Sequence, residues 1–434
     1  MSSTTCSVPL IADRVLPQRD LLLDREFMAE LFSRELGARG PIVIQRCEHI
    51  RTTYHAGESL RVAYKVFARE GACMVAGRAF PEGGSTKAFE AARQKAVHCG
   101  PFRPVFQDPE TESVFWTFPN DRKIANLQLL VDIPQEFAQL FDARWTGSNI
   151  VAYAPENCAT AQCLSAQNDV LAYAKVYASH HNESCFRTYT ALRQSAEAER
   201  AEIEFPEVIY HSAEHHILLL QALRGRRLAD VQGRELAEAF SRLGRALACL
   251  HAMPVPAHLP EFPRCTDSHM QLAAFSIGLV RPELAQQASE LCDALRTAKK
   301  QWSEQRVCLH GDVHPKNGIL LDTGSIALID LDQASLGSPA VDLGSLLAAL
   351  RYERRIGLLT EADERALADV FLSGYQQIGK LPEAESLRWH MAAALFAERA
   401  FRAVSRIRLP GLQILPELLR DAQRLASDSV EVCD

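Results

Sequence analysis

The 434-residue sequence predicts an α+β fold with three successive regions. Residues 1–145 mix helical and strand patterns, residues 146–223 are rich in short strands, and residues 224–434 are mainly helical. Strand and helix patterns are grouped instead of alternating regularly, which argues against a parallel sheet built from repeated strand–helix–strand units. The length also favours more than one domain. We therefore expect an N-terminal α/β region, a β-rich lobe and a helical lobe.

In the N-terminal region, apolar side chains between Leu21 and Phe32 recur at the spacing of one helical face. Runs of strand-forming residues follow, and Gly57 and Gly71 separate them as turn residues. These runs are residues 42–44, 60–67 and 72–76. The sequence then predicts a helix near residues 86–97.

In the second region, strands are expected between residues 150 and 177, followed by a helix near 185–195. Two apolar runs, residues 208–210 and 217–220, indicate buried strands. Two segments that begin with a tyrosine, residues 54–59 and 153–158, each precede a predicted strand pair. When the two strand pairs are compared, Arg78 takes the position of Lys175. Two interpretations stay open: unrelated hairpins, or a degenerate duplication in which Arg78 contacts phosphate or substrate.

The third region has a clear helical period. Five apolar residues are spaced by 4, 3, 4 and 3 positions and share one helical face: Leu236, Phe240, Leu243, Leu247 and Leu250. Helical patterns resume at Ala340 and continue toward the end of the sequence. Residues 307–332 form a β-rich interruption between the two helical stretches.

The bulk composition is that of an ordinary globular protein, with 47% hydrophobic and 23% charged residues. The net charge of −7 argues against a nucleic-acid partner, which normally selects a basic surface. The sequence has no export signal and no apolar run of membrane-spanning length. Its 12 cysteines form no Cys-x-x-Cys pair. We therefore expect a cytoplasmic protein with reduced thiols and no membrane partner.

The β-rich interruption carries the residues that suggest chemistry. An apolar strand leads into His310-Gly311-Asp312, and Asn317 follows five residues after Asp312. Residues 318–321 and 326–329 form an expected hairpin around the turn 322–325, and this hairpin leads to Asp330 and Asp332. Such a hairpin returns the aspartates and the Asn317 amide to one edge. Phosphoryl transfer needs this kind of group, because oxygen ligands hold Mg²⁺ and a carboxylate orients the attacking hydroxyl.

The segment His310–Asn317, together with Ile329-Asp330-Leu331-Asp332, resembles the signature of the aminoglycoside phosphotransferase and choline kinase superfamily. Three further segments resemble the family pattern: residues 243–251, 337–344 and 217–225. The resemblance implies a protein-kinase-like bilobal fold and Asp312 as catalytic base. It also implies Asn317 and Asp330 as Mg²⁺ ligands, with ATP or another nucleoside triphosphate as phosphate donor. The acceptor would be a hydroxyl of a small molecule, such as a sugar, an aminoglycoside or an amino alcohol. Residues 1–145 lie outside the family core, and some sugar kinases such as the maltokinases carry a comparable N-terminal cap.

The resemblance also assigns nucleotide contacts in the β-rich lobe. Lys175 would meet the α- and β-phosphates, residues 154–160 would form the loop over the phosphates, and the backbone of Gln221, Ala222 and Leu223 would contact the base. The family pairs this lysine with a glutamate on the next helix. Here the sequence departs from the pattern, because Glu183 is the only acid near the start of that helix.

Four nearby residues receive structural or open assignments. We expect His310, His314 and Asp342 to hold the catalytic loop, whereas Asp332 either binds a second metal or caps the strand end. The missing helix glutamate and the N-terminal extension leave a second interpretation open, a nucleotide-binding pseudokinase or regulatory module. A protein kinase fits less well, because the sequence shows no Ala-Pro-Glu segment after Asp332.

Overall fold

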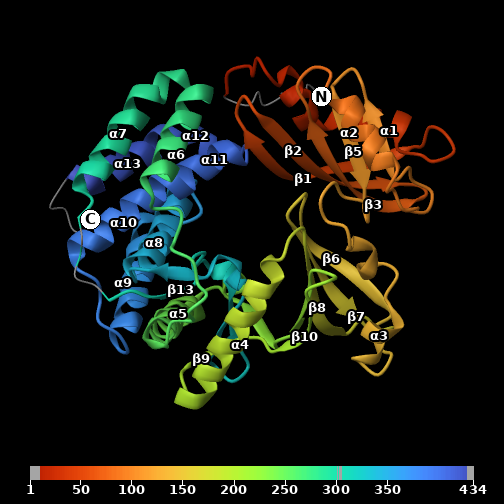
Figure 1. Ribbon diagram of the computed structural model, residues 1–434. Coiled ribbons are helices and arrows are strands. Elements are labelled where there is room, and N and C mark those ends of the chain that lie inside the picture. Colours follow the sequence, from red (N-terminus) through yellow and green to blue (C-terminus); the bar gives the residue numbers. More distant parts are fainter. Residues whose placement is uncertain (1–9, 301, 303–304, 428–434) are drawn as a thin grey trace. The chain divides into compact units, whose positions relative to one another are not determined.

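The computed structural model describes residues 10–300, 302 and 305–427. The chain divides into two compact units (Figure 1). The first unit comprises Met1–Asn182, Ile209–Ala222 and Ser405–Ile407. The second comprises Glu183–Val208, Leu223–Val404 and Arg408–Asp434. The finer division into 1–145, 146–223 and 224–434 stays a prediction.

The first unit begins with two 3₁₀ turns, η1 (Pro17–Arg19) and η2 (Leu21–Leu23), and the helix α1 (Arg25–Glu35). Asp24 caps α1 by accepting the backbone N–H groups of Glu26 and Phe27, as an N-terminal aspartate commonly does. A five-stranded antiparallel sheet follows in the spatial order β1-β2-β3-β5-β4. Its strands are β1 (Ile44–His55), β2 (Ser59–Ala68), β3 (Gly71–Ala79), β4 (Val105–Asp108) and β5 (Ser113–Thr117). The helix α2 (Ser85–Arg93) packs against β4 and β5.

A second five-stranded antiparallel sheet completes the first unit, in the order β10-β11-β8-β7-β6. Its strands are β6 (Gly147–Ala154), β7 (Cys158–Leu164), β8 (Val170–Tyr177), β10 (Val208–Ser212) and β11 (Ile217–Gln221). The short elements η3 (Leu127–Leu130) and α3 (Gln135–Gln139) connect the two sheets. Buried side chains from both sheets, including Ala76 and Ala159, form one apolar core. Both sheets contain three sequential antiparallel strands, β1-β2-β3 and β6-β7-β8, which is the topology that a duplication would produce.

The second unit is mainly helical. The long helix α4 (His181–Glu199) starts at the end of the first unit's main segment and continues into the second unit. The helices α5 (Arg234–Ala252) and α9 (Glu361–Gln376) pack closely, because each presents a glycine to the other's backbone. A Cβ at Gly244 would lie 2.1 Å from the Phe371 carbonyl oxygen, and one at Gly374 would lie 2.1 Å from that of Ser241. Neither position therefore has room for a side chain.

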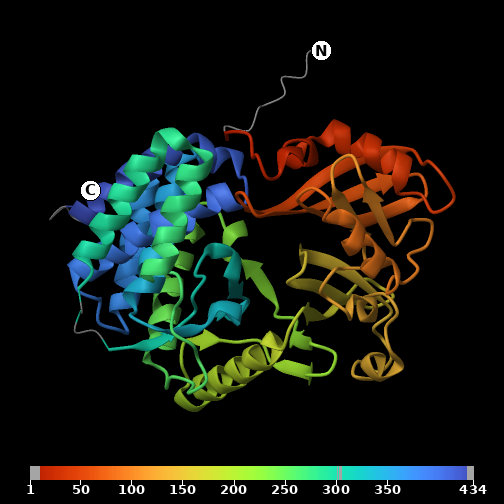
Figure 2. The same ribbon diagram turned by 45° about the horizontal axis from the view of Figure 1, so that its top comes forward.

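Further helices complete the second unit. They are α6 (Asp267–Val280), α7 (Ala285–Ala298), α8 (Ala340–Arg355), α10 (Ala384–Ala394), α11 (Phe401–Ser405), α12 (Leu409–Gln413) and α13 (Leu415–Ser427). Of these, α8 packs against α9. Figure 2 shows α6 and α7 as neighbouring green helices, in agreement with their packing. The 3₁₀ turns η4 (Leu228–Asp230) and η5 (Pro282–Leu284) precede α5 and α7. A π-helical segment, η8 (Leu395–Ala400), joins α10 to α11.

Two small sheets lie within the helical unit. The first has the order β12-β14-β15-β9, formed by β12 (Gly225–Arg227), β14 (Gly318–Leu321), β15 (Ile326–Leu328) and β9 (Ile203–Glu204). The second pairs β13 (Val307–Leu309) with β16 (Ser335–Gly337). The turns η6 (Pro315–Asn317) and η7 (Leu331–Gln333) flank the β14–β15 hairpin.

Most of the predicted elements are confirmed, and the differences have local causes. The hairpin at residues 318–329 is present with its turn at 322–325, and the apolar face predicted around Leu243 is buried in α5. The predicted helix 86–97 ends earlier, at Arg93, and the chain leaves it toward an Asn120 side chain that accepts the Val97 N–H. No described helix combines the length and the apolar character needed to cross a membrane. Ten cysteines in the described ranges carry free thiols.

Candidate active site

A buried aspartate in the second unit holds the start of the catalytic loop. The Asp342 carboxylate, at the N-terminal end of α8, accepts the backbone N–H of His310 at 2.7 Å and that of Gly311 at 2.9 Å. His251 Nε2 donates to the same carboxylate at 3.2 Å, while its Nδ1 accepts from the Tyr375 hydroxyl at 2.9 Å. Asp342 is fully buried, so these bonds replace water. The expected structural role of Asp342 is thereby confirmed.

His310 and Gly311 set the shape of the loop. His310 Nε2 donates to the Ile329 carbonyl oxygen at 2.9 Å, and its Nδ1 accepts the Asp312 N–H at 3.3 Å. These two partners define one neutral tautomer of the imidazole. Gly311 has a φ of 76°, and a Cβ there would lie 2.0 Å from the Gln333 carbonyl oxygen. Only glycine satisfies both conditions, because other residues rarely adopt a positive φ and would collide with this backbone.

The Asn317 side chain is oriented by the loop that contains Asp312. Its Nδ2 donates to the Asp312 backbone carbonyl oxygen at 3.0 Å, and the backbone carbonyl oxygen of Asn317 accepts the Ile329 N–H at 2.9 Å. The amide group has one nitrogen and one oxygen, so this bond directs Oδ1 away from the Asp312 backbone. The backbone bond places Asn317 beside Ile329, the residue that precedes Asp330.

Asp330 adopts a left-handed backbone conformation with a φ of 64° and a ψ of 55°. A non-glycine residue in this region costs free energy and needs support from its surroundings. That support comes from the Tyr189 hydroxyl on α4, which accepts the N–H of Asp330 at 2.9 Å and that of Leu331 at 3.3 Å. Tyr189 is buried and lies 141 residues from Asp330 in sequence. Sequence reasoning missed it, since no local pattern distinguishes this tyrosine from other core aromatics.

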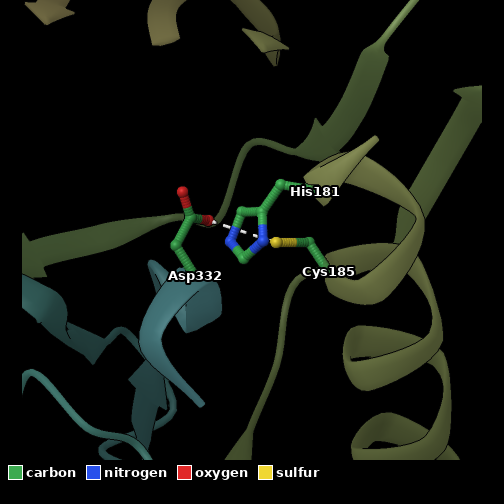
Figure 3. Close-up of side chains that lie close together, drawn as sticks. All are labelled: His181, Cys185 and Asp332. Atoms are coloured by element: carbon green, nitrogen blue, oxygen red, sulfur yellow. Dashed lines mark hydrogen bonds between the residues drawn. The ribbon is translucent and has the colours of Figure 1, made fainter. Parts of the chain in front are cut away.

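Asp332 lies beside helix α4. Figure 3 shows the Cys185 thiol and the Asp332 carboxylate facing each other, with His181 one helical turn before Cys185. The Cys185 Sγ is 3.5 Å from Oδ1 of Asp332. This contact connects the end of the hairpin to α4, and both roles expected for Asp332 stay predictions.

The Asp312 carboxylate lies next to two arginines and a histidine of the second unit. Arg402 Nη2 donates to its Oδ1 at 3.0 Å, Arg264 Nη1 lies 3.5 Å from the same oxygen, and His314 Nε2 lies 3.6 Å from Oδ2. Burial alone would raise the pKa of Asp312. The His314 imidazole and the charges of Arg402 and Arg264 outweigh burial and hold this pKa far below its usual range. Asp312 is therefore ionised at neutral pH.

Neither arginine was anticipated from the sequence. Arg264 also donates from Nη1 to the Gly311 carbonyl oxygen at 2.9 Å and from Nη2 to Gln333 Oε1 at 3.0 Å. It precedes α6, whereas Arg402 lies on α11, 90 residues from Asp312. Their convergence depends on how the C-terminal helices fold onto the loop, and spacing in the sequence contains no sign of it.

The residues predicted to bind nucleotide lie in the first unit, except Leu223, with which the second unit resumes. Lys175 is buried in β8, where its register partners are Thr160 on β7 and Leu218 on β11. Its ammonium group lies 5.5 Å from the centre of the Tyr177 ring. Gln221 ends β11, and Ala222 and Leu223 continue toward β12.

The start of α4 shows where the sequence departs from the family pattern. Glu183 forms an ion pair with Arg187, one turn later on the same helix, at 3.5 Å. The Thr188 hydroxyl contacts the Ser184 carbonyl oxygen and His258 Nε2, each at 2.9 Å. The partner of Lys175 therefore stays a prediction.

A second ionic cluster lies in the first unit, at the turn between β6 and β7. Residues 155–157 form this turn, which is shorter than the expected loop over 154–160. Glu156 has a φ of 64°, and its buried carboxylate accepts two hydrogen bonds of 2.7 Å from Arg122. Arg78 donates at 3.0 and 3.1 Å, and the nitrogens of Arg61 and Lys123 lie within 3.7 and 3.9 Å.

These charges determine the protonation state of Glu156. Burial would raise its pKa, but the hydrogen bonds from Arg122 and the charges of Arg78 and Arg61 lower it overall. The N-terminal region therefore holds the β6–β7 turn through an ionised glutamate. Arg78, the residue that the sequence aligned with Lys175, takes part in this contact.

A family model and several solved structures are similar to this chain. The model of the phosphotransferase enzyme family matches residues 174–410, more than half of the chain. Solved structures similar to the chain include a thermostable mutant of aminoglycoside phosphotransferase APH(4)-Ia, with 14% identity, a TM-score of 0.47, and coverage of 66% of this chain and 97% of that one. Aminoglycoside phosphotransferase APH(3'')-Id from Streptomyces rimosus has 21% identity and a TM-score of 0.42, over 59% of this chain and 95% of that one. A choline/ethanolamine kinase family protein from Mesorhizobium loti has 13% identity and a TM-score of 0.44, over 69% and 93%.

The family match begins in β8 and includes α4, the catalytic loop and the C-terminal helices up to α12. It therefore contains Asp312, Asn317 and Asp330 together with Lys175, whereas the sheet β1-β2-β3-β5-β4 lies before it. The chain belongs to the phosphotransferase enzyme family, and it is a small-molecule phosphotransferase.

Proposed function

We propose that this protein transfers the γ-phosphoryl group of ATP, or of another nucleoside triphosphate, to a hydroxyl group of a small molecule in a Mg²⁺-dependent reaction. The observation that carries the proposal is the arrangement of Asp312, Asn317 and Asp330 around one hairpin, with the Asn317 amide bonded to the Asp312 carbonyl oxygen. Asp312 would orient the attacking hydroxyl and receive its proton. Catalysis of this kind depends on positioning and on charge stabilisation.

Two oxygen ligands of this site suit Mg²⁺. Asn317 would offer Oδ1, because its Nδ2 is bonded to the Asp312 backbone. Asp330 would offer its carboxylate from a left-handed backbone that the Tyr189 hydroxyl supports. An amide and a carboxylate oxygen are typical ligands for this hard cation, which usually completes its shell with water and nucleotide phosphates. Bound there, Mg²⁺ would neutralise charge on the phosphates.

The nucleotide half of the proposal rests on Lys175 and the segment that follows β11. Lys175 is buried in β8, the central strand of its sheet, between β7 and β11. It would contact the α- and β-phosphates, while the backbone of Gln221, Ala222 and Leu223 would contact the base. Lys175→Met is expected to raise KM for the nucleotide, and Lys65→Met on the exposed side of β2 is the matched control.

The deciding experiment measures nucleotide consumption with Mg²⁺ across sugars, aminoglycosides and amino alcohols. Asp312→Asn keeps the size of the side chain and removes its charge. We expect this variant to lose about two to four orders of magnitude in kcat and to retain nucleotide binding. Removing Mg²⁺ with a chelator should abolish turnover of the wild type.

The pseudokinase alternative makes a different prediction for the same assays. It requires nucleotide binding without turnover of any acceptor. Turnover that is insensitive to Asp312→Asn would instead refute the proposed role of this aspartate, even if the protein proved to be a kinase.

A further inference from the structure

The oxygen that would face the acceptor hydroxyl is already in contact with two guanidinium groups. Arg402 and Arg264 both approach Oδ1 of Asp312, at 3.0 and 3.5 Å. Their side chains are only 26% and 14% exposed, so water screens their charges weakly. Arg402 lies on α11 and Arg264 precedes α6, so the C-terminal helical part of the second unit supplies this wall of the site.

A third arginine extends the positive wall. Arg399, on the π-helical segment η8, donates from Nη2 to the Ser345 carbonyl oxygen at 3.2 Å. Its Nε is buried and has no hydrogen-bond partner among the described residues. Burial lowers the pKa of Arg399, Glu398 opposes this, and the neighbouring charge of Arg402 lowers it further. We call Arg264, Arg399 and Arg402 the arginine cluster.

Within the described part of the chain, two carboxylates contact the arginine cluster directly. They are Asp312, which both Arg402 and Arg264 approach, and Glu398, which lies 3.7 Å from Arg264. Glu353 also interacts with Arg399. An anionic group of a ligand at this wall would therefore meet the positive charge of two guanidinium groups that share one oxygen of Asp312.

An acceptor that donates its hydroxyl hydrogen to Asp312 must approach the same carboxylate that Arg402 contacts. Substituents on neighbouring carbons of such an acceptor then lie within a few ångströms of the guanidinium groups. A cationic amine in that place would be repelled, whereas a carboxylate or a phosphate ester would meet the planar donor fork that binds these groups well.

Building on the proposed function, we propose that the acceptor carries an anionic group, a carboxylate or a phosphate ester, close to the hydroxyl that is phosphorylated, and that Arg402 and Arg264 bind this group. Both sources of negative charge offer the same paired oxygens to a guanidinium. The arginine cluster thereby determines the charge class of the substrate and excludes polycationic acceptors such as aminoglycosides.

The test compares acceptors that share a carbon skeleton and differ in charge. On a six-carbon skeleton these are gluconate, glucose phosphate, neutral glucose and cationic glucosamine. On a three-carbon skeleton they are glycerate, glycerol phosphate, glycerol and aminopropanediol. We expect kcat/KM to be higher for the anionic members by about 10- to 100-fold, the effect of a charge-assisted hydrogen bond. The carboxylate and phosphate arms identify which anion is preferred.

Variants then assign the preference to the cluster. Arg402→Gln should raise KM for the anionic acceptors by about 10- to 100-fold, with little change in KM for glucose or glycerol. Arg402→Lys should recover part of the preference because it keeps the charge. The control is Arg420→Gln, which removes an exposed arginine paired with Glu417 on α13 and should leave all constants unchanged.

Three results would overturn this inference while leaving the proposed function intact. One is faster phosphorylation of neutral or cationic members. Another is an equal loss of kcat for every acceptor in Arg402→Gln without a change in KM, which would make Arg402 only a positioning residue for Asp312. The third is the absence of both turnover and calorimetric binding for every anionic member in the presence of a non-hydrolysable ATP analogue. In contrast, turnover that persists in Asp312→Asn would refute the proposed function itself.

Discussion

The ionised Glu156 at the β6–β7 turn allows a quantitative test of how the N-terminal region stabilises the sheet that contains this turn. Its side chain is 3% exposed, and the pairs with Arg122 and Arg78 have N–O distances of 2.7 and 3.0 Å. Glu156→Gln keeps the size of the side chain but removes its charge, and it leaves several cations facing one another. Removing one partner of a fully buried ion pair costs about 3–5 kcal/mol. The guanidinium side chains are 34% and 22% exposed, so water screens part of this, and we expect about 2–3 kcal/mol.

Hydrogen exchange of the backbone amides in β6 and β7 measures this loss locally, which matters because the chain has two compact units. A loss of about 2–3 kcal/mol corresponds to exchange that is roughly 30- to 150-fold faster. The matched control is Glu48→Gln, which removes the surface pair between Glu48 and Arg46, whose side chains are 45% and 60% exposed. That change should cost at most about 0.5 kcal/mol.

The effect must also depend on pH with a defined sign. The pKa of Glu156 in the folded protein lies below its ordinary value of 4.5. The stabilisation is therefore fully present above pH 4.5 and is lost as the pH falls through the folded pKa. Wild type and Glu156→Gln should differ by a constant amount between neutral pH and about pH 5.5, and the difference should shrink below pH 4.5. A loss no larger than that of Glu48→Gln, or one that is independent of pH, would refute the reasoning.

Two further predictions concern the catalytic hairpin. Tyr189→Phe removes the hydroxyl that accepts the Asp330 and Leu331 N–H groups. We therefore expect Mg²⁺ affinity to fall by about 10- to 100-fold, while nucleotide affinity measured without metal stays unchanged. Unchanged Mg²⁺ affinity would mean that Asp330 keeps its conformation without this support. Gly311→Ala places a Cβ 2.0 Å from the Gln333 carbonyl oxygen at a φ of 76°. We therefore expect kcat to fall at least as far as in Asp312→Asn, and near-normal kcat would show that the loop can shift.

Much of the catalytic loop could be predicted from the sequence alone. The residues from His310 to Asp332 are close together in the chain, and a short hairpin of apolar strands can close in only one way when its turn lies at residues 322–325. The resemblance to the phosphotransferase family could therefore suggest Asn317 and Asp330 as metal-ligand candidates, because the motif that contains them is local. The contact of Asp342 with the loop was also predictable, because Asp342 lies only ten residues after Asp332, at the end of the hairpin.

The contacts that orient Asp330 and place positive charge beside Asp312 depend on tertiary structure. Tyr189 reaches Asp330 across 141 residues, and Arg402 reaches Asp312 across 90. Neither lies in a motif, since the position of a helical side chain relative to a distant loop depends on how whole helices pack. The same holds for Glu156, whose cationic partners come from β2, β3 and the segment after β5.

The sequence by itself therefore determined the class of chemistry, because phosphoryl transfer requires a few acids and an amide at short, fixed spacing. The packing of the second unit decided the electrostatic surroundings of Asp312. Charges act through space, so Arg264 and Arg402 affect Asp312 only once the chain has folded around it.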